Sequence, residues 1–163
     1  MFRRILVQID GSPTSNRGLD EAIDLARDQK ATICLLHVID ELIVPTGPDG
    51  MMYMPPSYID EYVRSLRAGG KKLLAQAEAK VRKRGIPVET MLRETLGRRV
   101  ADHIIKQAKR WHADVIVLGT HGRRGLSRVV MGSDAEMVLR ETPVPVLLIR
   151  SPLRQRPRRT KKR

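Results

Sequence analysis

The stretch from Gly119 to Ser133 holds the residues best suited to chemistry. Two glycines at a spacing of three, Gly119 and Gly122, follow the apolar run 115–118, and Gly132-Ser133 comes after nine intervening residues, before a helical pattern. A glycine backbone can take left-handed angles, and its N–H groups can approach phosphate oxygens closely. The N–H groups and the positive dipole end at a helix start also favour an anion. This order of strand, glycine loop and helix predicts a phosphate-binding loop.

The two most common phosphate-loop patterns do not occur in the sequence. There is no G-x4-G-K-[ST] and no G-x-G-x-x-G. The simpler alternative is that Gly119 only ends a strand and Gly132 only opens a helix. Arg123, Arg124 and Arg128 favour an anion in this loop, although arginines on an exposed loop are more often only solvated.

Alternating strand and helix patterns must position this loop. Five short apolar or β-rich runs predict strands, at 4–9, 31–38, 88–92, 115–118 and 146–149. Helical periodicity lies between them, so the order predicts right-handed crossovers and a doubly wound five-stranded parallel sheet with helices on both faces. The polar run 88–92 predicts an edge strand. In the helix predicted over 57–84, Gly69-Gly70 predicts a bend or break.

Asp10 follows the first predicted strand, and Ser12-Pro13 then gives an N-cap and a first helical residue. If the strand order is 3-2-1-4-5, the topological switch point lies between the first and fourth strands. Asp10 and the Gly119 loop then emerge at the same crevice, where open α/β sheets bind ligands. The alternative is that Asp10 only caps the helix that follows.

The spacing G-x2-G-x9-G-[ST] resembles the ATP-binding signature of the universal stress protein family, with matches at Gly119, Gly122, Gly132 and Ser133. The resemblance spans about residues 1–150 and includes 5–12, the Gly-Thr-His-Gly loop and the ending Thr-Pro-Val-Pro-Val-Leu. It implies an adenine nucleotide alpha hydrolase-like fold with strand order 3-2-1-4-5. It also implies a stress-response function and an adenine nucleotide as ligand. We expect ATP, while the sequence alone does not separate ATP from an AMP-like ligand.

The resemblance implies a set of ligand-binding residues: Ile9, Asp10, Val38, Leu118, Gly119, Gly122, Arg123, Gly132, Ser133 and Asp134. In this assignment Asp10 accepts hydrogen bonds from the adenosine part, and the backbone at Val38 recognises the adenine edge. The residues after Gly119 hold the phosphates. Asp134 stands where many members carry a small apolar residue, and Mg2+ would reconcile its carboxylate with a triphosphate.

No residue is marked as a catalyst. His121 and Asp134 are the groups near the loop that could handle a proton, but nothing positions either as a base for water. A slow ATPase and a nucleotide-dependent switch therefore both stay open, and a switch would use the long loop 39–56 or a dimer surface. The fifth strand is an apolar edge, and the resemblance implies dimers, so we expect a homodimer through that strand.

Much of the basic excess lies at the C-terminus. The chain has a formal net charge of +13, and eight of its 31 Lys and Arg lie in 150–163, where there is no acid. We expect a domain over 1–150 and a basic, disordered tail over 151–163. The alternative function is non-specific binding of nucleic acid or another anionic partner through this tail.

The 163 residues suffice for one core. No apolar run approaches about 18 residues and no signal peptide is recognisable, so we expect a cytoplasmic protein without membrane insertion. The single cysteine, Cys34, is expected in the core. His37 is interpreted as a structural residue at a strand end. His103 and His112, nine residues apart, do not share a helix face, so no metal site is predicted.

Overall fold

Strands and helices alternate along the chain in the computed structural model, which describes residues 1–40, 56–95, 98–120 and 131–150. The strands are β1 (Arg4–Gln8), β2 (Thr32–Ile39), β3 (Val88–Glu94), β4 (Val115–Gly119) and β5 (Val146–Ile149). The helices are α1 (Pro13–Gln29), α2 (Pro56–Arg82), α3 (Val100–Arg110) and α4 (Ser133–Glu141). The predicted loop 39–56 falls largely outside the described residues, as does the predicted tail 151–163.

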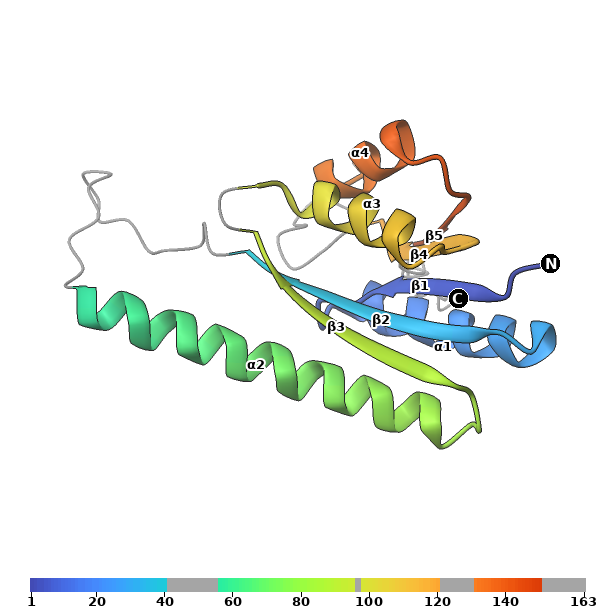
Figure 1. Cartoon of the computed structure of the whole chain (residues 1–163), viewed down its shortest axis with the longest axis horizontal. Helices are drawn as coiled ribbons and strands as arrows, with labels where there is room; N and C mark the ends of the chain where they lie inside the picture. The colour runs from blue at the N-terminus through green and yellow to red at the C-terminus, as the bar shows by residue number, and fades with distance from the viewer. Residues whose placement is uncertain (41–55, 96–97, 121–130, 151–163) are drawn as a thin grey trace, which may run out of the picture.

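The sheet has the order β3-β2-β1-β4-β5, and all four strand pairs are parallel (Figure 1). Helices α1 and α2 cover one face, and α3 and α4 cover the other. The predicted doubly wound architecture and strand order are therefore confirmed. The third strand lies at an edge, as predicted, but it extends to Glu94.

Two apolar clusters form the core, one on each face of the sheet. The first joins alternate residues of the central strands to α1 and α2, with Ile5, Val7 and Ile33 fully buried. The second joins the intervening residues, among them Leu6 and Ile116, to α3 and α4. This alternation is what a strand buried on both faces requires, because successive side chains point to opposite sides.

Helix α2 corrects one prediction. It runs unbroken through Gly69 and Gly70. A Cβ at Gly70 would lie 2.8 Å from Leu92 Cδ1 and 2.9 Å from His37 Cδ2, whereas a Cβ at Gly69 would meet nothing within 4 Å. Gly70 therefore lets the helix pack closely against the sheet, and this packing outweighs its poor intrinsic helix propensity.

Cys34 lies in the second cluster with no exposed surface, as expected of a core residue. Burial raises the pKa of its thiol to about 12, and the nearby Glu89 carboxylate acts in the same direction. Among the helices that the structure describes, none is long and apolar enough to cross a membrane.

Candidate functional site

The sheet opens at the C-terminal ends of its two central strands. The β1–β4 ladder stops at the pair Val7–Val117. Beyond it β1 stays with β2, since the Ile9 N–H donates to the Leu36 carbonyl at 2.9 Å. Strand β4 instead stays paired with β5 to Gly119. The two central strands thus turn to different neighbours, as expected at a topological switch point. Below, "switch point" means Ile9 and Asp10 after β1 together with 118–120 at the end of β4.

Asp10 is half-buried and held in a tight turn at the switch point. Its Oδ1 accepts the Ser12 N–H at 2.9 Å, and its own N–H donates to Ser15 Oγ at 3.1 Å. Ser12, not Asp10, is the N-cap of α1, because its Oγ accepts the Ser15 N–H at 3.1 Å. Asp10 thus orders the turn before α1 through one oxygen. Among the described residues its other oxygen, Oδ2, has no hydrogen-bond partner, so it can accept from a ligand.

His37 fixes the backbone next to Asp10. Its Nδ1 lies 2.7 Å from the Ile9 carbonyl oxygen, so Nδ1 carries the proton and donates. The ring is buried at 6% exposure, and its Cδ2 edge faces Gly70 of α2. The interpretation of His37 as a structural residue agrees with this geometry. His37 ties the end of β1 to β2 and holds the Ile9–Asp10 peptide in place.

The far ends of the glycine loop meet through the backbone. The Gly132 N–H donates to the Thr120 carbonyl at 2.8 Å, and the Thr120 N–H donates to the Ile149 carbonyl at 2.8 Å. Helix α4 therefore begins beside the end of β4, in the predicted order of strand, loop and helix. Gly132 is the N-cap of α4 and makes no side-chain cap. The first turn of α4 is therefore suited to an anion.

The described site residues divide between the two faces of the sheet. Val38 and Leu118 lie together in the second cluster, at 6% and 3% exposure. The Ile9 side chain is fully buried in the first cluster. Ile9 therefore reaches the switch point through its backbone, and its carbonyl and N–H are already used within the sheet.

Two acids occupy the first turn of α4. Glu136 forms an ion pair with Arg140, one turn further along the helix, with its Oε1 3.5 Å from Arg140 Nε. Asp134 is exposed. Gly122 and Arg123, predicted to hold phosphates, fall outside the described residues. Within residues 1–40, 56–95, 98–120 and 131–150, no group of three His, Cys, Asp or Glu could hold a metal ion.

The universal stress protein family model matches residues 1–150. The chain belongs to this family. Universal stress protein YxiE from Bacillus subtilis is 35% identical over 151 residues, which cover 92% of this chain and all of that protein. Universal stress protein UspA from Lactobacillus plantarum is 25% identical and has a TM-score of 0.76, covering 91% of this chain and 97% of that one. The resemblance inferred from the glycine spacing is therefore confirmed at the level of the family.

The structure of one relative was solved in complex with a nucleotide. The universal stress protein from Archaeoglobus fulgidus in complex with dAMP is 26% identical and has a TM-score of 0.60. The match covers 91% of this chain and 98% of that one. An adenine nucleotide is thus bound by a universal stress protein whose fold extends over nearly the whole length of both chains.

In this universal stress protein, sequence analysis missed how three residues shape the switch point: it did not single out Ser15 or Thr120, and it placed His37 at a strand end without its bond to the Ile9 carbonyl. Ser15 and Thr120 are 1% and 6% exposed. All three act on the backbone, through a side-chain oxygen, a ring nitrogen or a carbonyl. A hydroxyl in the first turn of a helix was a usable signal for Ser15. Nothing local in the sequence marks Thr120, because its role is a backbone hydrogen bond.

Proposed function

We propose that this universal stress protein binds an adenine nucleotide at the switch point, and that this nucleotide is ATP. The observation that carries the proposal is the divergence of β1 and β4 beyond Val7 and Val117. Beside it lies the start of α4, which has no side-chain cap and is held there by the hydrogen bond from the Gly132 N–H to the Thr120 carbonyl. The divergence leaves a carboxylate oxygen on one side and a helix N-terminus on the other. A nucleoside and its phosphates need these two kinds of group.

The proposed orientation follows from which groups are available. Asp10 Oδ2 accepts from the ribose hydroxyls, while Oδ1 keeps its bond to the Ser12 N–H. The backbone at Val38 meets the adenine edge, on the face where Leu118 also lies. Gly132 and Ser133 receive the phosphates at the start of α4, and the predicted contacts of Gly122 and Arg123 complete that end. The relative that binds dAMP supports adenine as the base.

The proposed role is a nucleotide-dependent switch, and slow hydrolysis of ATP is the second candidate. Each polar group that we describe at the switch point either makes a hydrogen bond to the backbone or is suited to binding the ligand. None of these groups is placed as a base that would activate water. Mg2+ would reach the site with the triphosphate, balancing its charge near Asp134. The switch is proposed to act in the cytoplasm.

A homodimer through β5 completes the proposal. This strand is the free edge next to β4, and its Leu147 is 38% exposed. An apolar edge strand favours pairing with a second copy, because the pairing satisfies its N–H and carbonyl groups and covers its side chains.

The experiment starts with the nucleotide that the purified protein releases on denaturation, identified by mass. Calorimetric titration with ATP and with GTP then tests the base. Asp10→Asn keeps an oxygen for the Ser12 N–H but removes the charge, so we expect a turn that still folds and an affinity lower by about tenfold or more. ATP affinity unchanged in Asp10→Asn, or equal affinity for GTP, would contradict the proposed orientation.

A further inference from the structure

The cations of helix α3 and of the two residues before it are not paired with neighbouring acids in the described part of the chain. Helices α1, α2 and α4 all carry ion pairs, such as Arg17–Glu21, Arg82–Glu78 and Arg140–Glu136. Residues 98–110 contain five Lys and Arg against one acid, Asp102. In the described part of the chain, none of those five cations makes an ion pair. Their positive charge is therefore available to an anionic partner.

Four basic residues of this segment form a row. Arg99, His103, Lys106 and Arg110 stand at spacings of four, three and four, so they lie within about 60° of one another around the helix. The opposite side of α3 carries the buried residues Ala101, Ile104, Ile105 and Ala108. The row is thus held by a helix packed on the sheet, and its length is about 16 Å. His103 is also fixed, with Nε2 3.3 Å from the Thr95 carbonyl oxygen.

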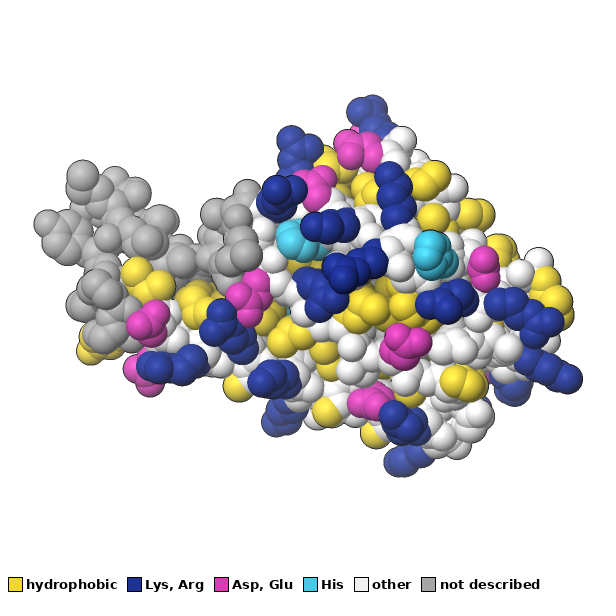
Figure 2. Space-filling view, viewed as in Figure 1, with side chains coloured by type: hydrophobic (Ala, Val, Ile, Leu, Met, Phe, Trp, Pro, Cys, Tyr) yellow, Lys and Arg dark blue, Asp and Glu magenta, His cyan; other side chains and the backbone are white. Residues whose placement is uncertain are grey.

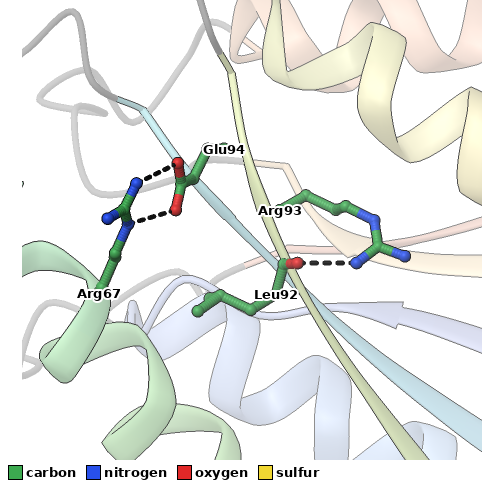
Figure 3. Close-up of polar contacts among 4 residues, drawn as sticks. All are labelled: Arg67, Leu92, Arg93 and Glu94. Atoms are coloured by element: carbon green, nitrogen blue, oxygen red, sulfur yellow. Dashed lines mark hydrogen bonds and ion pairs between the residues drawn. The ribbon is translucent and has the colours of Figure 1, made fainter.

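Strand β3 adds Arg93 to this surface. Glu94, its neighbour, is turned toward α2 by a two-pronged contact with Arg67, in which Nη2 donates to Oε2 at 2.9 Å (Figure 3). Arg93 points to the other side of β3, and its Nη1 donates to the Leu92 carbonyl at 2.8 Å. Glu89, an acid four residues before Arg93 in β3, accepts from Trp111 Nε1 at 3.1 Å. Figure 2 shows Lys and Arg side chains gathered over α3 and the adjoining sheet.

We propose that this surface, made by Arg93, Arg99, Lys106 and Arg110, binds the phosphate backbone of a nucleic acid without sequence specificity. A row of about 16 Å spans roughly five nucleotide steps of one duplex strand at 3.4 Å each. Guanidinium groups also match phosphate oxygens in pairs. The surface lies on α3 and β3, so it is separate from the predicted basic tail and does not depend on the nucleotide proposal.

The side chains around the row favour nucleic acid over a protein or a membrane. The large hydrophobic residues exposed in the described part of the chain are Met1, Tyr58, Leu139 and Leu147, none of them on α3 or β3. A protein interface has an apolar, charge-depleted core, and a helix that lies on a membrane inserts an apolar face next to its basic one. A phosphate backbone requires neither.

The test compares two double variants of the full chain, Lys106→Gln/Arg110→Gln and the control Lys71→Gln/Lys72→Gln. Both remove two exposed positive charges, but the control pair lies on α2. Fluorescence anisotropy with a labelled 20-mer, single-stranded and duplex, is measured at several salt concentrations. Losing two phosphate contacts reduces the magnitude of the negative slope of log affinity against log salt, by about 1.4 for the single strand and about 1.8 for the duplex.

We expect this fall in slope, and at least a tenfold loss of affinity, for the α3 variant and not for the α2 control. Equal losses in both variants would overturn the proposal, because they would assign binding to net charge. Unchanged oligonucleotide affinity in both variants would also overturn the proposal. So would an α3 variant that loses binding to phosphatidylserine vesicles but still binds the oligonucleotides. ATP affinity is measured in parallel, and it should be unchanged in both variants.

Discussion

Replacing Gly70 by alanine tests how helix α2 supports the switch point. The new Cβ would lie 2.8 Å from Leu92 Cδ1 and 2.9 Å from His37 Cδ2. The Leu92 methyl is the end of a flexible side chain and can move away. The His37 ring cannot move without straining or breaking its bond to the Ile9 carbonyl, 2.7 Å from Nδ1. The strain therefore falls on the peptide that precedes Asp10.

Two opposing terms set the size of the effect. Alanine gains about 1 kcal/mol over glycine in helix propensity. Overpacking costs about 1–3 kcal/mol, and loss of the His37 hydrogen bond adds about 1 kcal/mol. We therefore expect Gly70→Ala to be destabilised by about 1–3 kcal/mol net. Gly69→Ala is the matched control, because its Cβ meets nothing within 4 Å, and it should be stabilised by about 1 kcal/mol.

Urea unfolding of the two variants measures the difference, and an ATP titration shows whether the strain reaches the switch point. The free energy of unfolding should differ by at least about 2 kcal/mol between them, with the weaker ATP binding in Gly70→Ala. If Gly70→Ala proves as stable as Gly69→Ala, the close packing of α2 on His37 is wrong. If stability falls but ATP affinity does not, His37 does not position the site.

Three further predictions concern stability and assembly. Lys30 and His112 have positive φ angles of 52° and 54° after helices α1 and α3, a conformation that strains residues other than glycine. Lys30→Gly and His112→Gly should therefore each raise the free energy of unfolding by about 1 kcal/mol in urea titrations. An unchanged free energy of unfolding would show that these two residues are not strained. The Cys34 pKa of about 12 exceeds the ordinary 9.0, so the thiol's contribution to stability is present below pH 9 and is lost as pH rises toward 12. Parent stability should therefore fall relative to Cys34→Ala over that range, and parallel pH curves would contradict burial of the thiol. Leu147→Lys should halve the mass in sedimentation if β5 forms the dimer, whereas an unchanged mass would place the interface elsewhere.

Local patterns predicted the sheet and the ends of the glycine loop. The apolar runs match β1, β2 and β4 to within a residue or two, because strands buried on both faces show continuous apolar sequence. Ser12 and Pro13 predicted the start of α1, and Gly132-Ser133 that of α4. These signals depend on neighbouring residues in the chain, so sequence alone reveals them.

Features set by distant residues could not be predicted. Gly70 was interpreted as a helix breaker because intrinsic propensity is a local quantity, whereas its neighbours His37 and Leu92 come from β2 and β3. The His37 bond to Ile9 and the Thr120 bond to Gly132 likewise join separate segments. The phosphate-binding roles of Gly122 and Arg123 remain predictions, since both lie outside the described residues.

The most direct test of the central claim is a calorimetric titration of adenosine, AMP and ATP against the parent, Asp10→Asn and Ser133→Asp. Asp10 is placed at the nucleoside and Ser133 at the phosphates. Asp10→Asn should therefore weaken all three ligands by a similar factor. Ser133→Asp adds a negative charge worth about 1–4 kcal/mol near a phosphate, so it should weaken ATP most and leave adenosine unchanged. Equal losses for adenosine and ATP in Ser133→Asp would contradict the placement of an adenine nucleotide across this switch point.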